Sequence, residues 1–321
     1  MEQNNILCVR DLYVSYGDGV DISRNINFTV KKGEFLGVVG ESGCGKTTML
    51  RALMMLKKKP ADQIRGSICF DGQEMTRLTP EQLRQKRGAD IVMIPQNASI
   101  AMDGTKTISS LFLETVRMHG KKISRKESDA QAAKLMKTLL LDDPERILRS
   151  YPFELSGGMC QRIMIAVAMI NDPKMIFADE PTSALDVTSQ LQVVKQLQML
   201  RRNYGVSMVM ISHNLGVISA VSDNIAIMYG GRIVEYGSRD EVLNTPAHPY
   251  TKALIQAVPD IDGNISQGLP GTPPAFTKDM TGCPFAARCP RCEQRCCEIT
   301  PQEISLGGTH TVACLRAGED T

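Results

Sequence analysis

The chain has 321 residues, of which 42% are hydrophobic and 22% charged, and its net charge is +2. This length and apolar content allow one large domain with an appendage, and the balanced charge gives no broad electrostatic case for nucleic-acid binding. No run approaches the roughly 20 apolar residues of a membrane helix, and the first residues lack the pattern of a secretory signal. We therefore expect a protein that is soluble by itself and stays in the cytoplasm.

Apolar strands alternate with helices through most of the chain. Two β-rich runs are followed by a near-continuous apolar strand, at residues 6–9, 26–30 and 35–39. Further buried strands are predicted at residues 91–94, 175–178, 207–211 and 225–228. Helical patterns separate the strands at residues 47–56, 156–170, 185–203 and 214–220. This alternation predicts an α/β sheet with helices packed on both faces.

Two segments differ from that pattern. Residues 95–155 contain no strong strand and are mostly helical, which indicates a helical insertion into the α/β body. After residue 258 the composition changes to a linker type rich in Pro, Gly and Asp, and a Cys-rich tail follows. We predict a main domain over residues 1–258, with a helical subdomain at about 97–165, and a small Cys-rich C-terminal extension over 259–321.

A phosphate-binding loop follows the strand at residues 35–39. The segment GESGCGKTT fits G-x-x-x-x-G-K-[ST] between a buried strand and a helix, where a chance glycine turn is a poor alternative. Its backbone N–H groups and the helix dipole favour phosphate oxygens. Lys46 is expected to reach the β- and γ-phosphates of ATP, and the Thr47 hydroxyl to ligate Mg²⁺. The predicted ATP-binding residues of the loop are Gly40, Ser42, Gly43, Gly45, Lys46, Thr47 and Thr48.

Two strand ends carry candidate catalytic groups. Asp179 follows an apolar strand and is placed to hold Mg²⁺ through water, whereas Glu180 can orient or deprotonate the attacking water. His213 follows the strand at residues 207–211, at the end where ligands bind in open α/β sheets. A solvated acidic strand end and a structural histidine are the alternatives. We predict that Glu180 and His213 are catalytic.

A second glycine-rich helix start lies at residues 155–161, with the sequence LSGGMCQ. One nucleotide needs only one phosphate loop, so this segment requires its own explanation. The N–H groups of a helix start can face a phosphate. We therefore interpret the segment as a contact to the nucleotide of a different subunit, in which case the protein works as half of a pair.

Taken in chain order, these motifs resemble the ATP-binding cassette of ABC transporters over roughly residues 5–255. The resemblance implies an ABC-type P-loop ATPase, α/β in class, in a head-to-tail pair that shares its two ATP sites. It implies that Tyr16 stacks on adenine, that Gln96 senses Mg²⁺, and that Thr47, Gln96 and Asp179 hold this ion. It further implies a signature that contacts the partner's ATP, formed by Leu155, Ser156, Gly157, Gly158 and Gln161. Glu180 corresponds to the catalytic glutamate, Ser183 and Asp186 to the dimer-contact loop, and His213 to the switch histidine.

The subgroup follows from finer features. Four features resemble the "D" ATPase subunit of the peptide/nickel importer group: Met159, YPFE at residues 151–154, PAHPYT at 246–251 and LPGTPP at 269–274. This resemblance implies ATP-driven import of di- or oligopeptides, with nickel or a metal–chelator complex as the alternative cargo. The implied partners are a homologous second ATPase subunit, two permeases and, indirectly, an extracytoplasmic substrate-binding protein, and the implied location is the cytoplasmic face of the membrane.

The sequence departs from this group at two places. Asn214 stands where Asp is usual, and residues 97–103 diverge in the segment expected to face the membrane partner, which leaves the cargo open. Two functions outside the importers fit the sequence less well. A soluble ABC ATPase acting on DNA or ribosomes usually has a coiled-coil insertion or two cassettes, and this chain has neither. A small-molecule kinase would leave the signature and His213 unexplained.

Six of the ten cysteines lie between residues 283 and 314. A disulfide framework is disfavoured in reducing cytosol, so thiolate binding of zinc or an iron–sulfur cluster is the better account. The family resemblance points to four recurring ligands, Cys283, Cys289, Cys296 and Cys314. We predict that they hold a [4Fe–4S] cluster, with zinc as the alternative, which stabilises a coreless extension. Cys292 and Cys297 are then additional thiols.

Overall fold

The computed structural model describes residues 4–183, 185–257, 269–278 and 280–317. The chain forms two compact units. The first combines Met1–Arg77 with Ile211–Thr321, and the second consists of Leu78–Met210. The first unit therefore contains both the phosphate loop and the Cys-rich extension.

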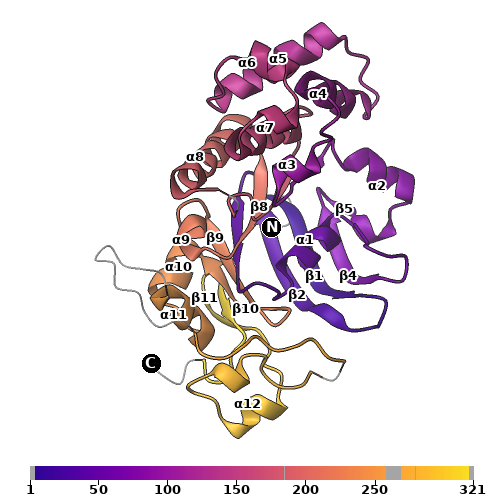
Figure 1. The fold of residues 1–321 in the computed structure, drawn as a ribbon. Coiled ribbons are helices and arrows are strands. Elements are labelled where there is room, and N and C mark those ends of the chain that lie inside the picture. The colour runs from indigo at the N-terminus through magenta and orange to yellow at the C-terminus, as the bar shows by residue number, and fades with distance from the viewer. Residues whose placement is uncertain (1–3, 184, 258–268, 279, 318–321) are drawn as a thin grey trace. The chain divides into compact units, whose positions relative to one another are not determined.

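An antiparallel sheet begins the first unit (Figure 1). Its order is β2 (Asp21–Lys31), β1 (Asn5–Ser15), β4 (Gln63–Phe70) and β5 (Gln73–Glu74). The sequence predicts parts of β1 and β2 but not β4. Most of β4 is exposed or half-buried, so it lacks the continuous apolar run of a buried strand.

The second sheet of this unit includes the strand that leads into the phosphate loop. Its strands lie in the order β11 (Ile304–Gly307), β12 (His310–Val312), β10 (Arg232–Ser238), β9 (Asn224–Tyr229) and β3 (Phe35–Val39). Strands β3 and β9 are parallel, and every residue of β3 is buried. The helices of this unit include α1 (Lys46–Leu53), α9 (Leu215–Ser219), α10 (Arg239–Asn244) and α11 (Pro249–Gln256). A continuous apolar run therefore predicts β3 and β9 well, because such runs are typical of buried parallel strands.

The Cys-rich extension shares the core of the first unit. Its strand β12 pairs with β10, in the register Glu235 to Val312. Phe285 and Val312 are fully buried. The extension also contains a short helix, α12 (Gln294–Glu298). The expected coreless appendage is thus joined to the main body by a sheet and by apolar packing.

A buried carboxylate reinforces this junction. Glu235 on β10 is only 1% exposed. Its oxygens accept hydrogen bonds from the backbone N–H groups of Ala247 and His248, at 2.8 and 2.9 Å. Its Oε1 also lies 2.7 Å from Nε2 of His310 on β12. One side chain therefore connects β10, the segment before α11 and the extension.

Glu235→Ala is expected to lower the free energy of unfolding by about 3–5 kcal/mol, because it removes one partner from a buried polar cluster and leaves the others unsatisfied. Urea unfolding followed by circular dichroism measures the change. Glu81→Ala is the control, since Glu81 forms an exposed pair with Arg84, and exposed ion pairs contribute little to stability. Equal losses in the two variants would contradict a structural role for the Glu235 cluster.

The second unit combines parallel strands with a group of helices (Figure 1). Strand β6 (Ile91–Ile94) is parallel to β7 (Met175–Asp179), and β8 (Ser207–Ser212) is the other neighbour of β7. Its helices are α2 (Pro80–Lys86), α3 (Ala98–Ala101), α4 (Ile108–Arg117), α5 (Arg125–Thr138), α6 (Pro144–Arg149), α7 (Gly157–Met169) and α8 (Val187–Tyr204). Within the described residues, the segment 95–155 holds helices and no strand, as its sequence predicts.

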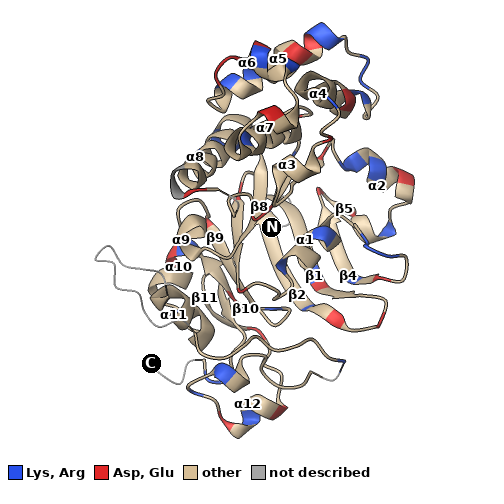
Figure 2. Ribbon diagram, viewed as in Figure 1, with Lys and Arg blue, Asp and Glu red and all other residues tan. Residues whose placement is uncertain are grey.

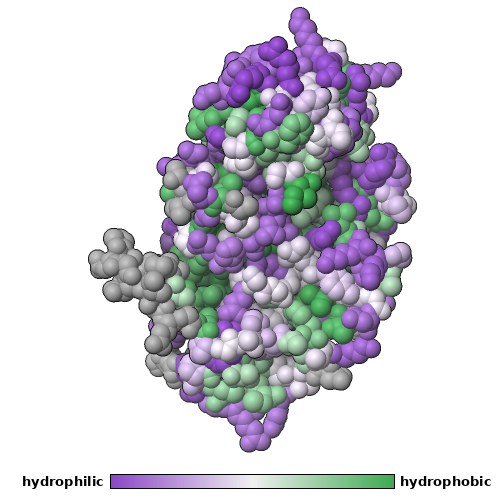
Figure 3. All heavy atoms as spheres, viewed as in Figure 1, coloured by the Kyte–Doolittle hydropathy of each residue, from purple (hydrophilic) through white to green (hydrophobic). Residues whose placement is uncertain are grey.

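The charged side chains of the second unit lie mainly on its exposed helices. Figure 2 shows Lys and Arg along α2, α5 and α6, and Figure 3 shows hydrophilic residues over α5 and α6. Some of these charges form exposed pairs, such as Arg84 with Glu81 on α2 at 2.7 Å, and pairs of this kind stabilise a fold only weakly. In the part of the chain that the structure describes, no helix combines the length and apolar character needed to cross a bilayer.

Candidate functional site

The phosphate loop joins β3 to α1 and requires glycine at its ends. Gly45, directly before α1, has a φ of 102°. A Cβ atom at Gly40 would lie 2.1 Å from the carbonyl oxygen of Met228. A side chain at either position would therefore strain or displace the backbone. The start of α1 at Lys46 places the positive end of the helix dipole at this loop, which favours an anion.

Lys46 is held against this loop. Its side chain is buried, and Nζ donates hydrogen bonds to the carbonyl oxygens of Gly40 and Glu41, at 2.7 and 2.9 Å. Thr47 is exposed at the first turn of α1. Cys44 is buried, and burial raises the pKa of its thiol, which fits a small filler residue better than a reactive thiol.

Tyr16 lies beside the same helix. Its hydroxyl and the Thr48 hydroxyl are 2.7 Å apart. Nζ of Lys58 lies 4.9 Å from the centroid of the Tyr16 ring, within the range of a cation–π interaction. Two residues predicted to bind ATP, Tyr16 and Thr48, are therefore direct neighbours.

His213 follows β8 and is exposed. The next residue, Asn214, caps α9, because its side chain accepts a hydrogen bond from Val217 N at 3.2 Å.

The second unit brings together two other predicted site residues. Nε2 of Gln96 lies 3.5 Å from Oε2 of Glu180. Glu180 has a φ of 45°, an uncommon conformation for a residue with a long side chain. The backbone N–H and the hydroxyl of Ser183 both donate to the Glu180 carbonyl oxygen at 3.1 Å, which holds this turn. Asp179, at the end of β7, is buried.

The predicted signature forms the start of α7. Ser156 caps the helix by accepting a hydrogen bond from Met159 N at 3.3 Å. Ser156 and Gly157 are exposed, and nothing lies within 4 Å of a Cβ built at Gly157. This helix start is therefore open to a ligand. Gln161 differs, since it is buried and its Nε2 has no hydrogen-bond partner among the described residues.

The predicted dimer-contact loop precedes α8. Asp186 caps α8, since its carboxylate accepts from the N–H and hydroxyl of Ser189 at 3.0 and 2.7 Å. Asp186 is exposed. Ser183 belongs to the turn that begins at Glu180.

Four cysteines of the extension surround one small cavity of about 20 Å³. They are the four predicted ligands, Cys283, Cys289, Cys296 and Cys314. The other two, Cys292 and Cys297, are exposed, with their sulfur atoms 3.9 Å apart.

The thiols that line the cavity are weakly acidic. Burial, with a smaller contribution from the neighbouring thiols, raises the pKa of Cys283 to about 11. Among the described residues, no group of three or more His, Cys, Asp or Glu side chains is arranged to hold a metal ion. The donor chemistry fits a thiophilic metal, and the predicted cluster stays a prediction.

No sequence pattern predicts a further contact of the phosphate loop. Arg288 of the extension donates to both carboxylate oxygens of Glu41, at 2.7 and 3.0 Å. The two residues are 247 positions apart. Neither local periodicity nor a motif links them, so only the folded chain reveals this pair.

Comparison with known proteins decides the family. Residues 23–183 match the family model described as ABC transporter, and residues 234–296 match the oligopeptide/dipeptide transporter C-terminal region. Over 315 residues the chain is 39% identical to the dipeptide transport ATP-binding protein DppD of Bacillus subtilis (strain 168), covering 96% of this chain and 94% of that protein. The chain belongs to the ABC transporter ATPases. It therefore binds and hydrolyses ATP, with Mg²⁺, to power transport.

Further relatives agree with this membership. The chain is 37% identical over 320 residues to the oligopeptide transport ATP-binding protein OppD of Escherichia coli (strain K12), covering 98% of this chain and 94% of that protein. Among solved structures, it resembles a dimeric ATP-binding cassette in a post-hydrolysis state bound to ADP and phosphate. The TM-score is 0.65 at 25% identity, covering 73% of this chain and 98% of that one. The predicted family, α/β ABC fold and ATPase activity are confirmed.

Proposed function

We propose that this ABC ATPase powers the import of di- or oligopeptides across the cytoplasmic membrane. The observation that carries the proposal is the match of residues 234–296 to the C-terminal region of oligopeptide/dipeptide transporters. Relatives that cover nearly the whole chain, from Bacillus subtilis and Escherichia coli, are named for dipeptide and oligopeptide transport. Import of nickel or a metal–chelator complex by the same kind of ATPase is the alternative.

The proposed assembly places the chain at the cytoplasmic face of the membrane, on two permease subunits. A homologous second ATPase subunit completes a heterodimer, and an extracytoplasmic binding protein delivers the cargo. Two features of the second unit support this assembly. The signature helix start at Ser156 and Gly157 is open, and the segment at residues 97–103 carries Ile100, whose side chain is 80% exposed. An apolar side chain exposed to this degree is suited to a protein contact.

The proposed catalytic roles follow the chemistry of each side chain. Lys46 binds the β- and γ-phosphates, and Thr47, Gln96 and Asp179 hold Mg²⁺, which neutralises charge that develops on the phosphates. Glu180 orients the attacking water and accepts its proton. His213 contacts the γ-phosphate and reports its loss.

The remaining proposed contacts involve the partner. Leu155, Ser156, Gly157, Gly158 and Gln161 are assigned to the ATP held by the second subunit, and Ser183 and Asp186 to the dimer-contact loop. For Gln161, whose side chain is buried, this contact requires a change at the start of α7. The proposed ABC domain covers residues 1–258, with its helical subdomain at about 97–165, and the extension covers 259–321. The boundary at residue 258 lies outside the described residues.

Peptide uptake by cells tests the cargo. Deletion of the gene is expected to abolish ATP-dependent uptake of radiolabelled di- or oligopeptides, and re-expression of the wild-type chain to restore it. Re-expression of Lys46→Ala serves as the control for ATP dependence and should not restore uptake. Loss of nickel uptake with unchanged peptide uptake would transfer the assignment to the metal importers.

We further propose that Cys283, Cys289, Cys296 and Cys314 hold a [4Fe–4S] cluster, with zinc as the alternative. Support comes from the common cavity that these four thiols line and from the preference of iron–sulfur clusters and zinc for four cysteine ligands. The cluster would stabilise the extension around that cavity, and no catalytic step is assigned to it.

Metal analysis of anaerobically purified protein tests this assignment. About four iron atoms and four acid-labile sulfides per chain are expected for a [4Fe–4S] cluster. Cys289→Ser should lose most of both, whereas Cys292→Ser is the control and should keep them, because Cys292 lies outside the cavity. Zinc without iron and sulfide would establish the alternative, and absence of all three would remove the metal site.

A further inference from the structure

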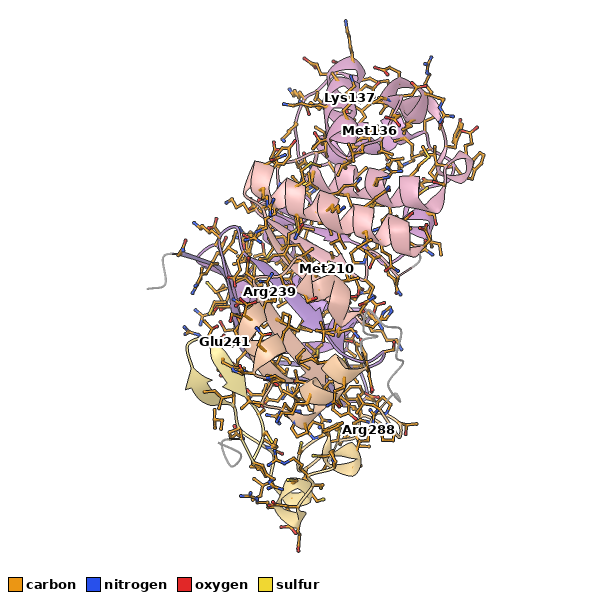
Figure 4. All side chains as sticks on the ribbon, turned by 90° about the vertical axis from the view of Figure 1, so that its left-hand side faces the viewer. Met136, Lys137, Met210, Arg239, Glu241 and Arg288 are labelled. Carbon is orange, nitrogen blue, oxygen red and sulfur yellow. The ribbon has the colours of Figure 1, made fainter. Side chains whose placement is uncertain are left out.

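The Cys-rich extension reaches the phosphate loop through one buried arginine. Arg288, labelled in Figure 4, ends a short 3₁₀ turn, Ala286–Arg288. Its side chain is only 5% exposed. Its two terminal nitrogens donate to the two carboxylate oxygens of Glu41, at 2.7 and 3.0 Å. This bidentate pairing is the strongest geometry available to an arginine and a carboxylate.

The other donors of Arg288 are also used. The guanidinium donates to the Tyr229 hydroxyl at 3.1 Å and to the carbonyl oxygens of Leu269 and Pro270 at 3.3 and 2.8 Å. An arginine has five N–H donors, so every donor has an acceptor. A side chain with this many fixed contacts has one orientation, and Glu41 is held with it.

Glu41 connects Arg288 to the lysine of the loop. Its carbonyl oxygen accepts the hydrogen bond from Nζ of Lys46 at 2.9 Å. Its N–H donates to the hydroxyl of Tyr250 at 3.0 Å, and Tyr250 packs against Phe285 of the extension with ring centroids 5.4 Å apart. Two contacts from the C-terminal part of the unit therefore fix the residue that follows Gly40.

The pairing of Glu41 with Arg288 changes the net charge of the phosphate loop. Glu41 places a carboxylate inside a loop that receives a polyphosphate, and like charges at short range oppose binding. A guanidinium paired with both oxygens cancels this charge and holds the carboxylate in place. Without Arg288, the carboxylate would be an unpaired negative charge in the phosphate-binding loop.

We propose that Arg288 is a positioning residue for ATP binding, through which the Cys-rich extension controls the affinity of the phosphate loop for ATP. The inference rests on the proposed role of Lys46 and its loop in holding ATP. Arg288 acts through Glu41 and does not touch the nucleotide. The extension is thus part of the ATP site as well as an attachment to the fold.

Titration of the full-length chain with a fluorescent ATP analogue tests the proposal. Arg288→Gln should raise the Kd by about tenfold or more, the size expected from one uncompensated charge near the phosphates. Glu41→Gln alone should not raise the Kd, because it removes the carboxylate charge that Arg288 neutralises in the wild type. The double variant Glu41→Gln/Arg288→Gln should return to within about threefold of wild type.

Recovery in the double variant distinguishes positioning from a merely structural role. If Arg288 only stabilised the extension, removing the Glu41 charge would not restore binding, and the double variant would bind as weakly as Arg288→Gln. Arg295→Ala is the matched control, because Arg295 forms an exposed pair with Glu293 in the same extension. Should Arg288→Gln fail to fold, Arg288→Met with and without Glu41→Gln gives the same comparison, because it also removes the guanidinium charge.

The outcomes separate this proposal from the assignment of the ATP site. Lys46→Ala is measured alongside. If Lys46→Ala loses affinity while Arg288→Gln stays within about threefold of wild type, the role of Arg288 is wrong and the ATP site stands. If Lys46→Ala also binds like wild type, the assignment of the loop itself fails.

Discussion

Glu180→Gln is expected to bind ATP like the wild type and to hydrolyse it about 10²- to 10⁴-fold more slowly, the usual contribution of a positioned general base. Glutamine keeps the size of the side chain and can keep the contact to Gln96, which is 3.5 Å long in the wild type, but it cannot accept a proton from water. The positive φ of Glu180, at 45°, orients the side chain through the backbone and is unchanged by this substitution. Phosphate release under saturating ATP measures the loss of kcat.

A matched control tests whether the loss of any glutamate charge in this unit lowers kcat. Glu145→Gln changes an exposed glutamate on α6 of the same unit and should leave kcat unchanged. ATP-analogue binding by Glu180→Gln shows whether the site is intact. Turnover by Glu180→Gln at the wild-type rate, with normal binding, would show that another group activates the water.

The strands show why part of this fold is predictable from sequence. Strands β3 and β6 begin and end at the predicted residues because each is a short, continuous apolar run with polar or glycine-rich boundaries. The sequence pattern does not predict strand β10. It pairs antiparallel with β9 and β12, and only part of it is buried. Its identity depends on its neighbours rather than on its own periodicity.

Helix boundaries differ from the predictions for local reasons. Helix α8 was predicted from residue 185 and begins at Val187, because Asp186 serves as its N-cap. In the segment predicted to be mostly helical, α5 ends at Thr138, and Leu140 just beyond it has a φ of 55°. A positive φ at a non-glycine residue is not readable from sequence, since tertiary packing imposes it.

The candidate site likewise contains residues that the sequence predicts and contacts that it does not predict. Lys46, Gln96 and Glu180 are recognisable because each belongs to a motif with a fixed position relative to a strand or helix. The pair of Glu41 and Arg288 carries no such signal, because the contact joins two segments that are distant in sequence. The burial of Gln161 is equally unreadable, since a glutamine in a signature motif looks the same whether its side chain faces a ligand or the core.

Lys46→Ala is expected to raise the Kd for ATP by about 10- to 150-fold, because hydrogen bonds to charged groups contribute about 1.5–3 kcal/mol. The ammonium group donates to the Gly40 and Glu41 carbonyl oxygens, so it lies at the loop that receives the phosphates. Fluorescent ATP-analogue titration measures the change, and thermal unfolding confirms that the variant is folded. Lys32→Ala is the control, since Lys32 is an exposed residue of the same unit paired with Asp71.

Lys46→Ala and Arg288→Gln weaken ATP binding for different reasons. Lys46→Ala removes a positive charge that binds the phosphates, whereas Arg288→Gln leaves the negative charge of Glu41 unpaired. Only Arg288→Gln is therefore rescued by Glu41→Gln. Rescue of Lys46→Ala by Glu41→Gln to wild-type affinity would instead mean that net charge, and not the position of the ammonium group, sets the affinity of this loop for ATP.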